Sequence, residues 1–214
     1  MNNCRLYLIS PPAIDLPIFA EKLEEAFSGG DIGSFQLRLK NMSDEDVLKA
    51  AETLIPICHA HDAAFILNDN PYLAAACNAD GVHIGQDDCS LKKARAIVGD
   101  ERVIGVSCHD SRHLAMEAGE QGADYVAFGA FYPTTSKSPE ALAKYGVPKA
   151  DILEWWQEFM VLPCVAIGGM NPGNCGALVK AGADFIAVIT AVWNHPKGPA
   201  EAVREFNKAI KDAV

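Results

Sequence analysis

The chain has 214 residues, half of them apolar, and its 18 Lys and Arg side chains are outnumbered by 28 Asp and Glu, giving a net charge of −10. An acidic surface of this kind repels nucleic acid, so nucleic-acid binding is not expected. There is no apolar run of about 18 residues and no signal-peptide pattern at the start, so neither a membrane span nor secretion is expected. Seven scattered cysteines without a C-x-x-C motif indicate free thiols and a cytoplasmic location.

Short apolar segments alternate with amphipathic segments along the whole sequence. The apolar segments are predicted strands, at residues 4–9, 34–39, 64–69, 81–85, 102–108, 125–131, 163–169 and 185–192. The amphipathic segments are predicted helices, at residues 16–27, 43–61, 71–77, 90–98, 111–121, 150–159, 172–182 and 199–214. Ser43 and Ser90 stand where N-caps belong, and Asn171-Pro172 resembles an N-cap followed by a proline in the first helical position.

The predicted strands are short, apolar and mostly without alternation, as in a parallel sheet that is buried on both faces. Eight strand–helix units in roughly 200 to 250 residues predict a (β/α)8 TIM barrel, here a single domain over residues 1–214. A weak internal repeat agrees, because N-A-D-G-V-H-I-G, G-A-D-Y-V-A-F-G and G-A-D-F-I-A-V-I lead into strands four, six and eight. A doubly wound open sheet is the alternative, but its glycine-rich G-x-G-x-x-G is absent after the first strand.

Two carboxylates follow neighbouring predicted strands. Asn68 and Asp69 end the third strand and Asp88 follows the fourth, and the two strands form one βαβ unit. Parallel neighbours lie roughly 5 Å apart, so Asp69 and Asp88 are expected to face one site. Such hard oxygen ligands, completed by water and phosphate, predict a Mg²⁺ site. Either carboxylate alone also fits a helix N-cap, so the prediction depends on the pair.

Other polar residues gather at the carboxyl ends of the predicted strands, where the active site of this fold lies. They supply cations, hydroxyls, amides and glycine N–H groups, a composition suited to phosphate: Gln36, Arg38, Lys40, Gln86, Asp87, Ser107, His109, Thr134, Thr135, Ser136, Lys137, Gly168, Gly169, Ile189, Thr190 and Ala191. Mid-strand His83 is interpreted as a hydrogen-bonded core residue.

Two anion sites are predicted within this set. Gly168-Gly169, with Thr190-Ala191 on the next strand, matches the phosphate site that barrels form after strands seven and eight. Arg38, Lys40, Lys137 and the metal would form the other site, and that charge suits a diphosphate. The alternative interpretations are a helix-packing turn for the two glycines and a solvated loop for P-T-T-S-K at residues 133–137.

Several motifs together resemble the thiamine phosphate synthase family along nearly the whole chain. They are Q-L-R-L-K at 36–40, L-N-D at 67–69, G-V-H-I-G-Q-D-D at 81–88, G-V-S-C-H at 105–109, F-G-A-F-Y-P-T-T-S-K at 128–137 and A-I-G-G at 166–169. The resemblance implies a transferase that joins hydroxymethylpyrimidine diphosphate to thiazole phosphate, giving thiamine phosphate and pyrophosphate. Two positions depart from the family pattern, with Leu39 in place of an acidic residue and Ser136 in place of threonine.

The resemblance also implies residue roles. Mg²⁺ would be held by Asp69 and Asp88. The pyrimidine diphosphate would be contacted by Gln36, Arg38, Lys40 and Asn68, and its leaving group by the catalytic residues Arg38, Ser107 and Lys137. The thiazole phosphate would be bound by Thr134, Ser136, Gly169, Ile189 and Thr190.

Two other functions stay open at this stage. One is a thiazole tautomerase-like isomerase, which needs no metal and for which His109 offers an acid–base group. The other is a non-catalytic barrel that binds a phosphate ligand. The sequence leaves a homo-oligomer open and predicts no partner besides small-molecule substrates.

Overall fold

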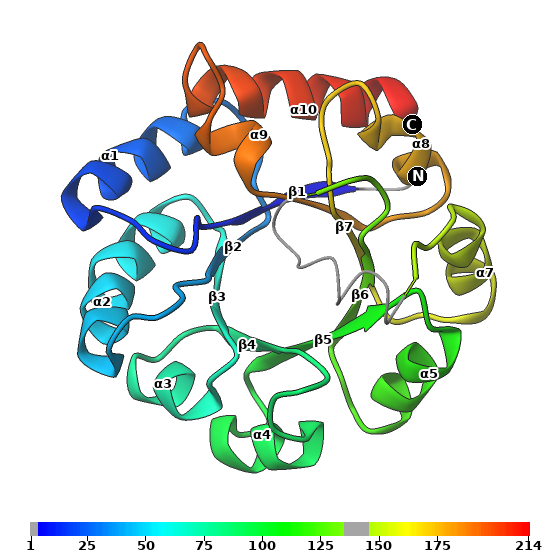
Figure 1. The fold of residues 1–214 in the computed structure, drawn as a ribbon, viewed down its shortest axis with the longest axis horizontal. Coiled ribbons are helices and arrows are strands. Elements are labelled where there is room, and N and C mark those ends of the chain that lie inside the picture. The colour runs from blue at the N-terminus through cyan, green and yellow to red at the C-terminus, as the bar shows by residue number, and fades with distance from the viewer. Residues whose placement is uncertain (1–3, 135–145) are drawn as a thin grey trace.

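The computed structural model describes residues 4–134 and 146–214, and at its centre eight parallel strands close into a barrel (Figure 1). The strands follow one another around the barrel in chain order, and the last pairs with the first. They are β1 (Arg5–Ile9), β2 (Ser34–Leu37), β3 (Ala64–Asn68), β4 (Gly81–Ile84), β5 (Val103–His109), β6 (Tyr125–Gly129), β7 (Cys164–Ile167) and β8 (Phe185–Val188). The predicted (β/α)8 TIM barrel is therefore confirmed.

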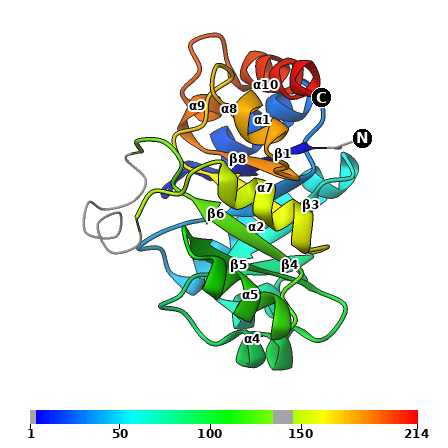
Figure 2. The same cartoon turned by 90° about the vertical axis from the view of Figure 1, so that its right-hand side faces the viewer.

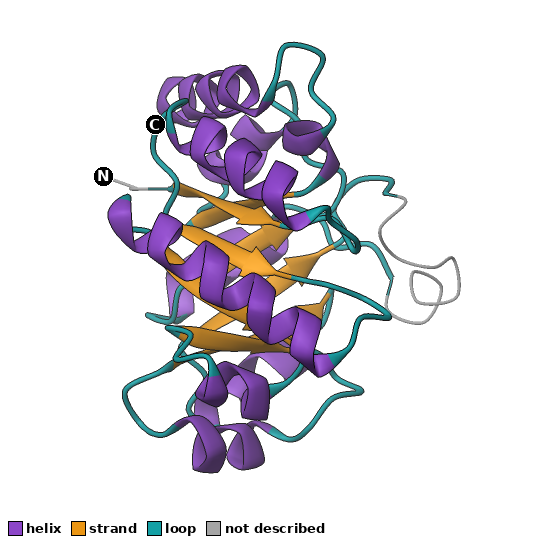
Figure 3. Ribbon diagram, turned by 90° about the vertical axis from the view of Figure 1, so that its left-hand side faces the viewer, coloured by secondary structure: helices purple, strands orange, loops and turns teal. Residues whose placement is uncertain are grey.

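A ring of helices surrounds the strands, which slant through the centre in the side views (Figures 2 and 3). The described helices are α1 (Leu16–Phe27), α2 (Asp44–Ala60), α3 (Pro71–Ala76), α4 (Leu91–Val98), α5 (Arg112–Glu120), α7 (Asp151–Phe159), α8 (Cys175–Lys180), α9 (Thr190–Trp193) and α10 (Pro199–Ala213). The long α10 lies between α1 and α8 on the outside of the barrel. Within residues 4–134 and 146–214, no helix combines the length and the apolar character that a membrane crossing requires.

Five of the described helices have an N-cap residue whose side-chain oxygen accepts backbone N–H groups of the first turn. The capping residues are Asp15, Ser43, Asn70, Ser90 and Ser111. Two of these caps, Ser43 and Ser90, are the ones that the sequence predicts. They could be predicted because a cap depends only on a polar side chain and the three residues that follow it.

The predicted end of the eighth strand and the predicted start of the helix after the seventh strand are wrong. Strand β8 ends at Val188 rather than at residue 192, and the short helix α9 follows it at once. Helix α8 begins at Cys175 rather than at residue 172. Asn171 still makes the bonds of a cap, because its side chain accepts the Gly173 N–H and its carbonyl accepts the Cys175 N–H, but residues 172–174 form a turn in place of the first helical residues.

Alternate residues of each strand face opposite sides of the barrel wall. In β4, Val82 and Ile84 pack outward against the helices, whereas His83 between them faces the interior. The interior cluster contains aromatic and small side chains together: Tyr7, Ile9, Ile66, Tyr125, Ala127, Val165 and Ala187. All the strands end at the same face of the barrel. Only the inward-facing residues near these ends can line a site there, and the alternation decides which residues these are.

The internal repeat has a structural role at the other end of the strands. Asp80, Asp124 and Asp184 stand just before or at the start of β4, β6 and β8, and each carboxylate accepts a backbone N–H of the preceding odd-numbered strand at 2.7, 2.7 and 2.8 Å. The donors are Phe65, Ile104 and Cys164. The same carboxylate oxygen also contacts a side chain of the helix before that strand, namely His59, Arg95 or Gln157. Each aspartate therefore ties together one helix and two strands.

We expect Asp124→Ala to lower the free energy of unfolding by about 2 kcal/mol, because it leaves a strand N–H without its charged acceptor. Asp124→Asn keeps an acceptor oxygen and should lose less. Urea denaturation of both variants measures the difference. Glu52→Ala, which changes an exposed side chain in the middle of α2, is the matched control and should stay within about 0.5 kcal/mol of the original protein. Equal losses for Asp124→Ala and Glu52→Ala would contradict the role of the repeat.

Candidate functional site

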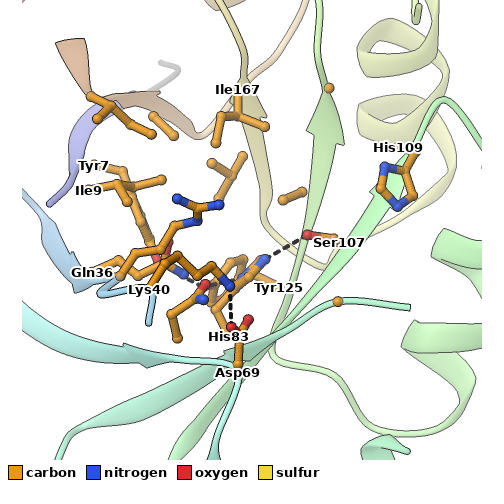
Figure 4. Close-up of a pocket in the computed structure, with 18 residues that line it drawn as sticks. Tyr7, Ile9, Gln36, Lys40, Asp69, His83, Ser107, His109, Tyr125 and Ile167 are labelled. Carbon is orange, nitrogen blue, oxygen red and sulfur yellow. Dashed lines mark hydrogen bonds and ion pairs between the residues drawn. The ribbon is translucent and has the colours of Figure 1, made fainter. Parts of the chain in front are cut away.

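A cavity of about 190 Å³ opens at the carboxyl ends of the strands (Figure 4). Its wall is made of inward-facing residues from all eight strands and the loops that follow them: Tyr7, Ile9, Gln36, Arg38, Lys40, Asn68, Asp69, His83, Gly85, Ser107, His109, Tyr125, Ala127, Gly129, Val165, Ile167, Ala187 and Ile189. One side is aliphatic and the other carries the charged and amide groups. Such a cavity suits a flat ring with a charged substituent.

The charged side is organised around an ion pair between Lys40 and Asp69. The Lys40 ammonium lies 2.5 Å from Asp69 Oδ2, and both side chains are a little more than a third exposed. Asp69 adopts a backbone φ of 68°, which an L-residue rarely takes, and this conformation lies directly at the end of β3. Asp and Asn tolerate this conformation better than other side chains, and Asn41, Asp62 and Asn78 adopt it as well, so it marks a turn at the end of the strand.

Asp88 faces Asp69 from the loop after β4. Partial burial raises the pKa of the Asp88 carboxyl, and the neighbouring Asp69 carboxylate raises it further. The Gly85 N–H, which donates to Asp88 at 2.7 Å, and Lys40 act in the opposite direction. A carboxylate whose charge is disfavoured by a neighbouring carboxylate marks a place where a cation is stabilised. Among the described residues no third His, Cys, Asp or Glu completes a metal cluster.

The loop after β2 carries the second cation of the cavity. Gln36 is almost fully buried and Arg38 lies two residues further along the same inward face. The Arg38 N–H donates to the buried Ser10 hydroxyl at 2.8 Å, which fixes the backbone where the strand ends. Leu39, the departure from the family pattern, packs outward against the core beneath the helices, so it does not replace a group of the cavity.

Ser107 lies at an irregularity of β5. The pairing with β6 shifts between Ser107 and His109, and His109 has a φ of 56°. Gln86 donates to the Ser107 carbonyl at 2.6 Å, and the Ser107 hydroxyl lies 2.9 Å from His83 Nε2. A bulge of this kind re-aims side chains at the rim of a barrel. Figure 4 shows Ser107 turned toward the cavity, with His109 apart from the Lys40–Asp69 pair.

A smaller cavity of about 50 Å³ lies beside the first, between the loops after β6, β7 and β8. Its wall includes Thr134, Gly168, Gly169, Ile189 and Thr190. Thr190 is the first residue of α9, and a short extra helix after strand eight is a common part of phosphate sites in this fold.

The two glycines also serve packing. Gly169 has a φ of 63°, and a Cβ there would lie 2.5 Å from the Pro133 carbonyl oxygen. At Gly168 a Cβ would lie 2.3 Å from the Ala130 side chain. These close contacts are with the loop after β6 rather than with a helix, so a larger residue at Gly169 would disturb that loop before it reached a ligand.

A sequence profile described as thiamine monophosphate synthase matches residues 6–192. The chain belongs to this family. It is 55% identical over 211 residues to the thiamine-phosphate synthase of Rhodospirillum centenum, covering 99% of this chain and 100% of the relative. It is 48% identical to the thiamine-phosphate synthase of Hyphomonas neptunium, covering 95% and 92% of the two chains. Thiamine-phosphate synthases are transferases, so the chain is an enzyme of that class.

Solved structures agree with the family. The thiamine phosphate pyrophosphorylase of Pyrococcus furiosus superposes with a TM-score of 0.85 at 30% identity, covering 100% of this chain and 98% of that one. An orotidine 5′-phosphate decarboxylase of Pyrococcus horikoshii superposes with a TM-score of 0.68 at 14% identity, over 96% and 99% of the chains, and shows the shared barrel alone.

The structure places the predicted thiamine-phosphate synthase site residues in adjoining positions. The larger cavity takes Gln36, Arg38, Lys40, Asn68, Asp69, Ser107 and Ile189, and the smaller one takes Thr134, Gly169, Ile189 and Thr190. Asp88 contacts the larger cavity through Asp69 rather than lining it. Ser136 and Lys137 lie outside the described residues, so their roles stay predictions.

The sequence missed the two tyrosines of the cavity. Tyr7 and Tyr125 line its floor, and their hydroxyl oxygens lie 2.9 Å apart although 118 positions separate them in the chain. Both occupy inward positions of strands, which is a signal that strand alternation could have given. Gly105 provides the space for one of the rings, because a Cβ there would lie 1.9 Å from Tyr125 Cζ.

Proposed function

We propose that the enzyme joins hydroxymethylpyrimidine diphosphate to thiazole phosphate, forming thiamine phosphate and releasing pyrophosphate with Mg²⁺ as cofactor. The observation that carries the proposal is the facing pair Asp69 and Asp88 beside Lys40 and Arg38, at a cavity of about 190 Å³. Two carboxylates and two cations at the ends of three neighbouring strands suit a metal-bound diphosphate better than a single phosphate.

The residues present fit a magnesium ion. Asp69 and Asp88 supply hard anionic oxygens, and the raised pKa of Asp88 marks a position where added positive charge would be stabilising. Two protein ligands are enough, because Mg²⁺ usually keeps several waters and binds substrate phosphate oxygens. When bound, the ion would neutralise charge that develops on the departing diphosphate. In the described chain Lys40 holds the Asp69 carboxylate in place.

The chain's own groups would act by position and charge. Arg38 and Lys40 would stabilise the leaving diphosphate, with Ser107 donating a hydrogen bond to it. The amides of Gln36 and Asn68 would orient the pyrimidine ring over the aliphatic wall formed by residues such as Ile167. Loss of diphosphate leaves a benzylic-type cation that the ring amino group stabilises, so the thiazole nitrogen needs only correct placement and no strong base.

The smaller cavity would hold the thiazole phosphate. It adjoins the larger one through shared residues, Ile167, Ala187 and Ile189, so a ring between the two could reach the pyrimidine carbon. Backbone N–H groups near Gly169 and the hydroxyls of Thr134 and Thr190 are the donors available there. This division gives each substrate its own anion site.

Thr190→Val tests that division, because it removes a hydroxyl while keeping the shape of the side chain. We expect the affinity for thiazole phosphate to fall roughly tenfold, the worth of a hydrogen bond to a charged group. Binding of diphosphate with Mg²⁺, measured separately by calorimetry, should stay as in the original enzyme. Thr53→Val is the matched control, since that exposed hydroxyl donates only to the Lys49 carbonyl within α2. Equal weakening of both ligands would contradict the two-site division.

A thiazole tautomerase-like isomerase is the second candidate, and His109 is the observation in its favour. The imidazole lines the larger cavity and its backbone is strained, as functional residues often are. An isomerase of this kind would have no use for Asp69, Asp88 and Arg38 at neighbouring strand ends, so the synthase is preferred. Incubation with thiazole phosphate alone would separate the two, because only an isomerase would change it.

A further inference from the structure

A row of hydrogen-bonded side chains runs beneath the larger cavity and ends at Ser107, its one member with a part in the chemistry proposed above. Tyr7 and Tyr125 share a hydrogen bond of 2.9 Å, and the Tyr125 hydroxyl lies 2.9 Å from His83 Nδ1. The other ring nitrogen, Nε2, lies 2.9 Å from Ser107 Oγ, which faces the cavity (Figure 4). The row therefore connects the floor of the barrel to a group that is placed to touch substrate.

The inner end of the row is anchored to a group that can only accept. The Ser34 side chain neighbours the Tyr7 hydroxyl and acts on its pKa, and the Ser34 hydroxyl donates to the Ala64 carbonyl at 3.2 Å. Tyr7 and Tyr125 are only 4% and 6% exposed. Burial raises the pKa of both phenols, so each keeps its proton, and a buried hydroxyl without a partner would be unfavourable.

The hydrogen bonds of the row can all point one way or all point the other way, because each bond holds a single proton. A neutral imidazole carries one N–H and has one accepting nitrogen. In the inward direction Ser107 donates to His83 Nε2, His83 Nδ1–H donates to Tyr125, and Tyr125 donates to Tyr7. In the outward direction every bond is reversed: Tyr125 donates to Nδ1, Nε2–H donates to Ser107, and the Ser107 proton is free to face the cavity.

The free enzyme should favour the inward direction. When the Ser34 hydroxyl donates to the Ala64 carbonyl, the inward direction supplies one proton for each contact between neighbouring groups from Ser107 to Ser34. The outward direction would leave the oxygens of Tyr7 and Ser34 facing each other without a proton between them, unless Ser34 gives up the carbonyl. An anion in the cavity changes this balance, because phosphoryl oxygens only accept and their hydrogen bonds are strong.

We propose that a phosphoryl group bound against Ser107 turns the row outward and fixes His83 as its Nε2–H tautomer. His83 and Tyr125 are then positioning residues that hold the Ser107 hydroxyl as a donor toward the substrate. This inference rests on the proposed function for the placement of a phosphoryl group at Ser107. Its value for the reaction is that the donor is already oriented when charge develops on the leaving group.

Nitrogen NMR of the enzyme with ¹⁵N-labelled histidine tests the inference directly, because protonated and unprotonated ring nitrogens resonate far apart. The spectra are recorded about 1.5 pH units above the ordinary histidine pKa, with and without inorganic diphosphate and Mg²⁺. His83→Asn identifies the His83 signals by their loss. We expect Nδ1–H in the free enzyme and Nε2–H in the diphosphate complex. The same tautomer in both samples, or protons on both nitrogens, overturns the inference.

Two matched variants distinguish positioning from mere packing. Tyr125→Phe removes the only partner of Nδ1 in the row, so the free enzyme should lose its preference for Nδ1–H and kcat should fall roughly tenfold with little change in KM. Tyr7→Phe removes an equally buried hydroxyl one step away, and it leaves Tyr125 no acceptor except His83. It should therefore show Nε2–H even without diphosphate. Equal losses of kcat in both variants with unchanged tautomers would overturn the inference.

The same samples separate this inference from the proposed function. Diphosphate that binds with Mg²⁺ but leaves the His83 tautomer unchanged overturns the inference alone. If diphosphate does not bind at all, both the anion site of the proposed function and the inference drawn from it are overturned.

Discussion

Replacing Asp69 by Asn should lower kcat/KM by roughly a thousandfold, because a metal ion that stabilises transition-state charge is worth several kcal/mol. The substitution removes one of two facing carboxylates and releases the Lys40 ammonium that Asp69 now holds. Folding should be nearly unaffected, since a partly exposed ion pair of this kind contributes at most about 1 kcal/mol. Steady-state kinetics over a range of Mg²⁺ concentrations, together with thermal melting, measure both effects.

Asp88→Asn should lose activity in the same way but differ in stability. The folded protein raises the pKa of Asp88, so the charged carboxylate is disfavoured there and stability is lost as pH rises through that raised pKa. Above that pH the metal-free Asp88→Asn variant should melt no lower than the original enzyme, and it should no longer be stabilised by Mg²⁺. Asp87→Asn, with the same change of charge one residue away, is the control. Loss of Mg²⁺ dependence in all three variants, or in none, would rule out the pair as the metal site.

Arg38→Met should reduce kcat by roughly a hundredfold, since removing one preorganised charge contact to a leaving group costs about 3 kcal/mol. The backbone of Arg38 is fixed by its N–H bond to Ser10, which the substitution leaves intact. Arg38→Lys should recover part of the rate, because lysine supplies the charge without the paired N–H groups. Single-turnover kinetics isolate the chemical step from product release.

A loss confined to KM in Arg38→Met would show that the guanidinium binds the ground state and transition state equally. A loss of thiazole phosphate binding with normal diphosphate binding would place Arg38 at the other anion site. Either result would contradict its assignment to the leaving group.

The elements that could be predicted from the sequence depend on local chemistry. Helix α1 begins and ends at the predicted residues, and Ser43 and Ser90 cap helices because each cap is contained in one turn. The end of β8 was missed for a related reason. Residues 189–192 are as apolar as the strand before them, so composition does not show that the chain turns into α9 at Thr190.

The site also has one part that could be predicted from the sequence and one part that could not. Asp69 and Asp88 could be expected to meet because they follow neighbouring strands within one short βαβ unit, and the structure brings them together. The floor of the cavity could not be found by this route. Tyr7 and Tyr125 come from strands that are far apart in sequence, and their contact depends on the closure of the barrel and on the space that Gly105 leaves.

The most direct measurement is product formation by the purified enzyme given hydroxymethylpyrimidine diphosphate and thiazole phosphate. We expect thiamine phosphate and pyrophosphate in equal amounts, with the reaction stopped by EDTA and restored by excess Mg²⁺. Unchanged turnover in EDTA would contradict the metal site, and conversion of thiazole phosphate without the pyrimidine substrate would contradict the proposed synthase reaction itself.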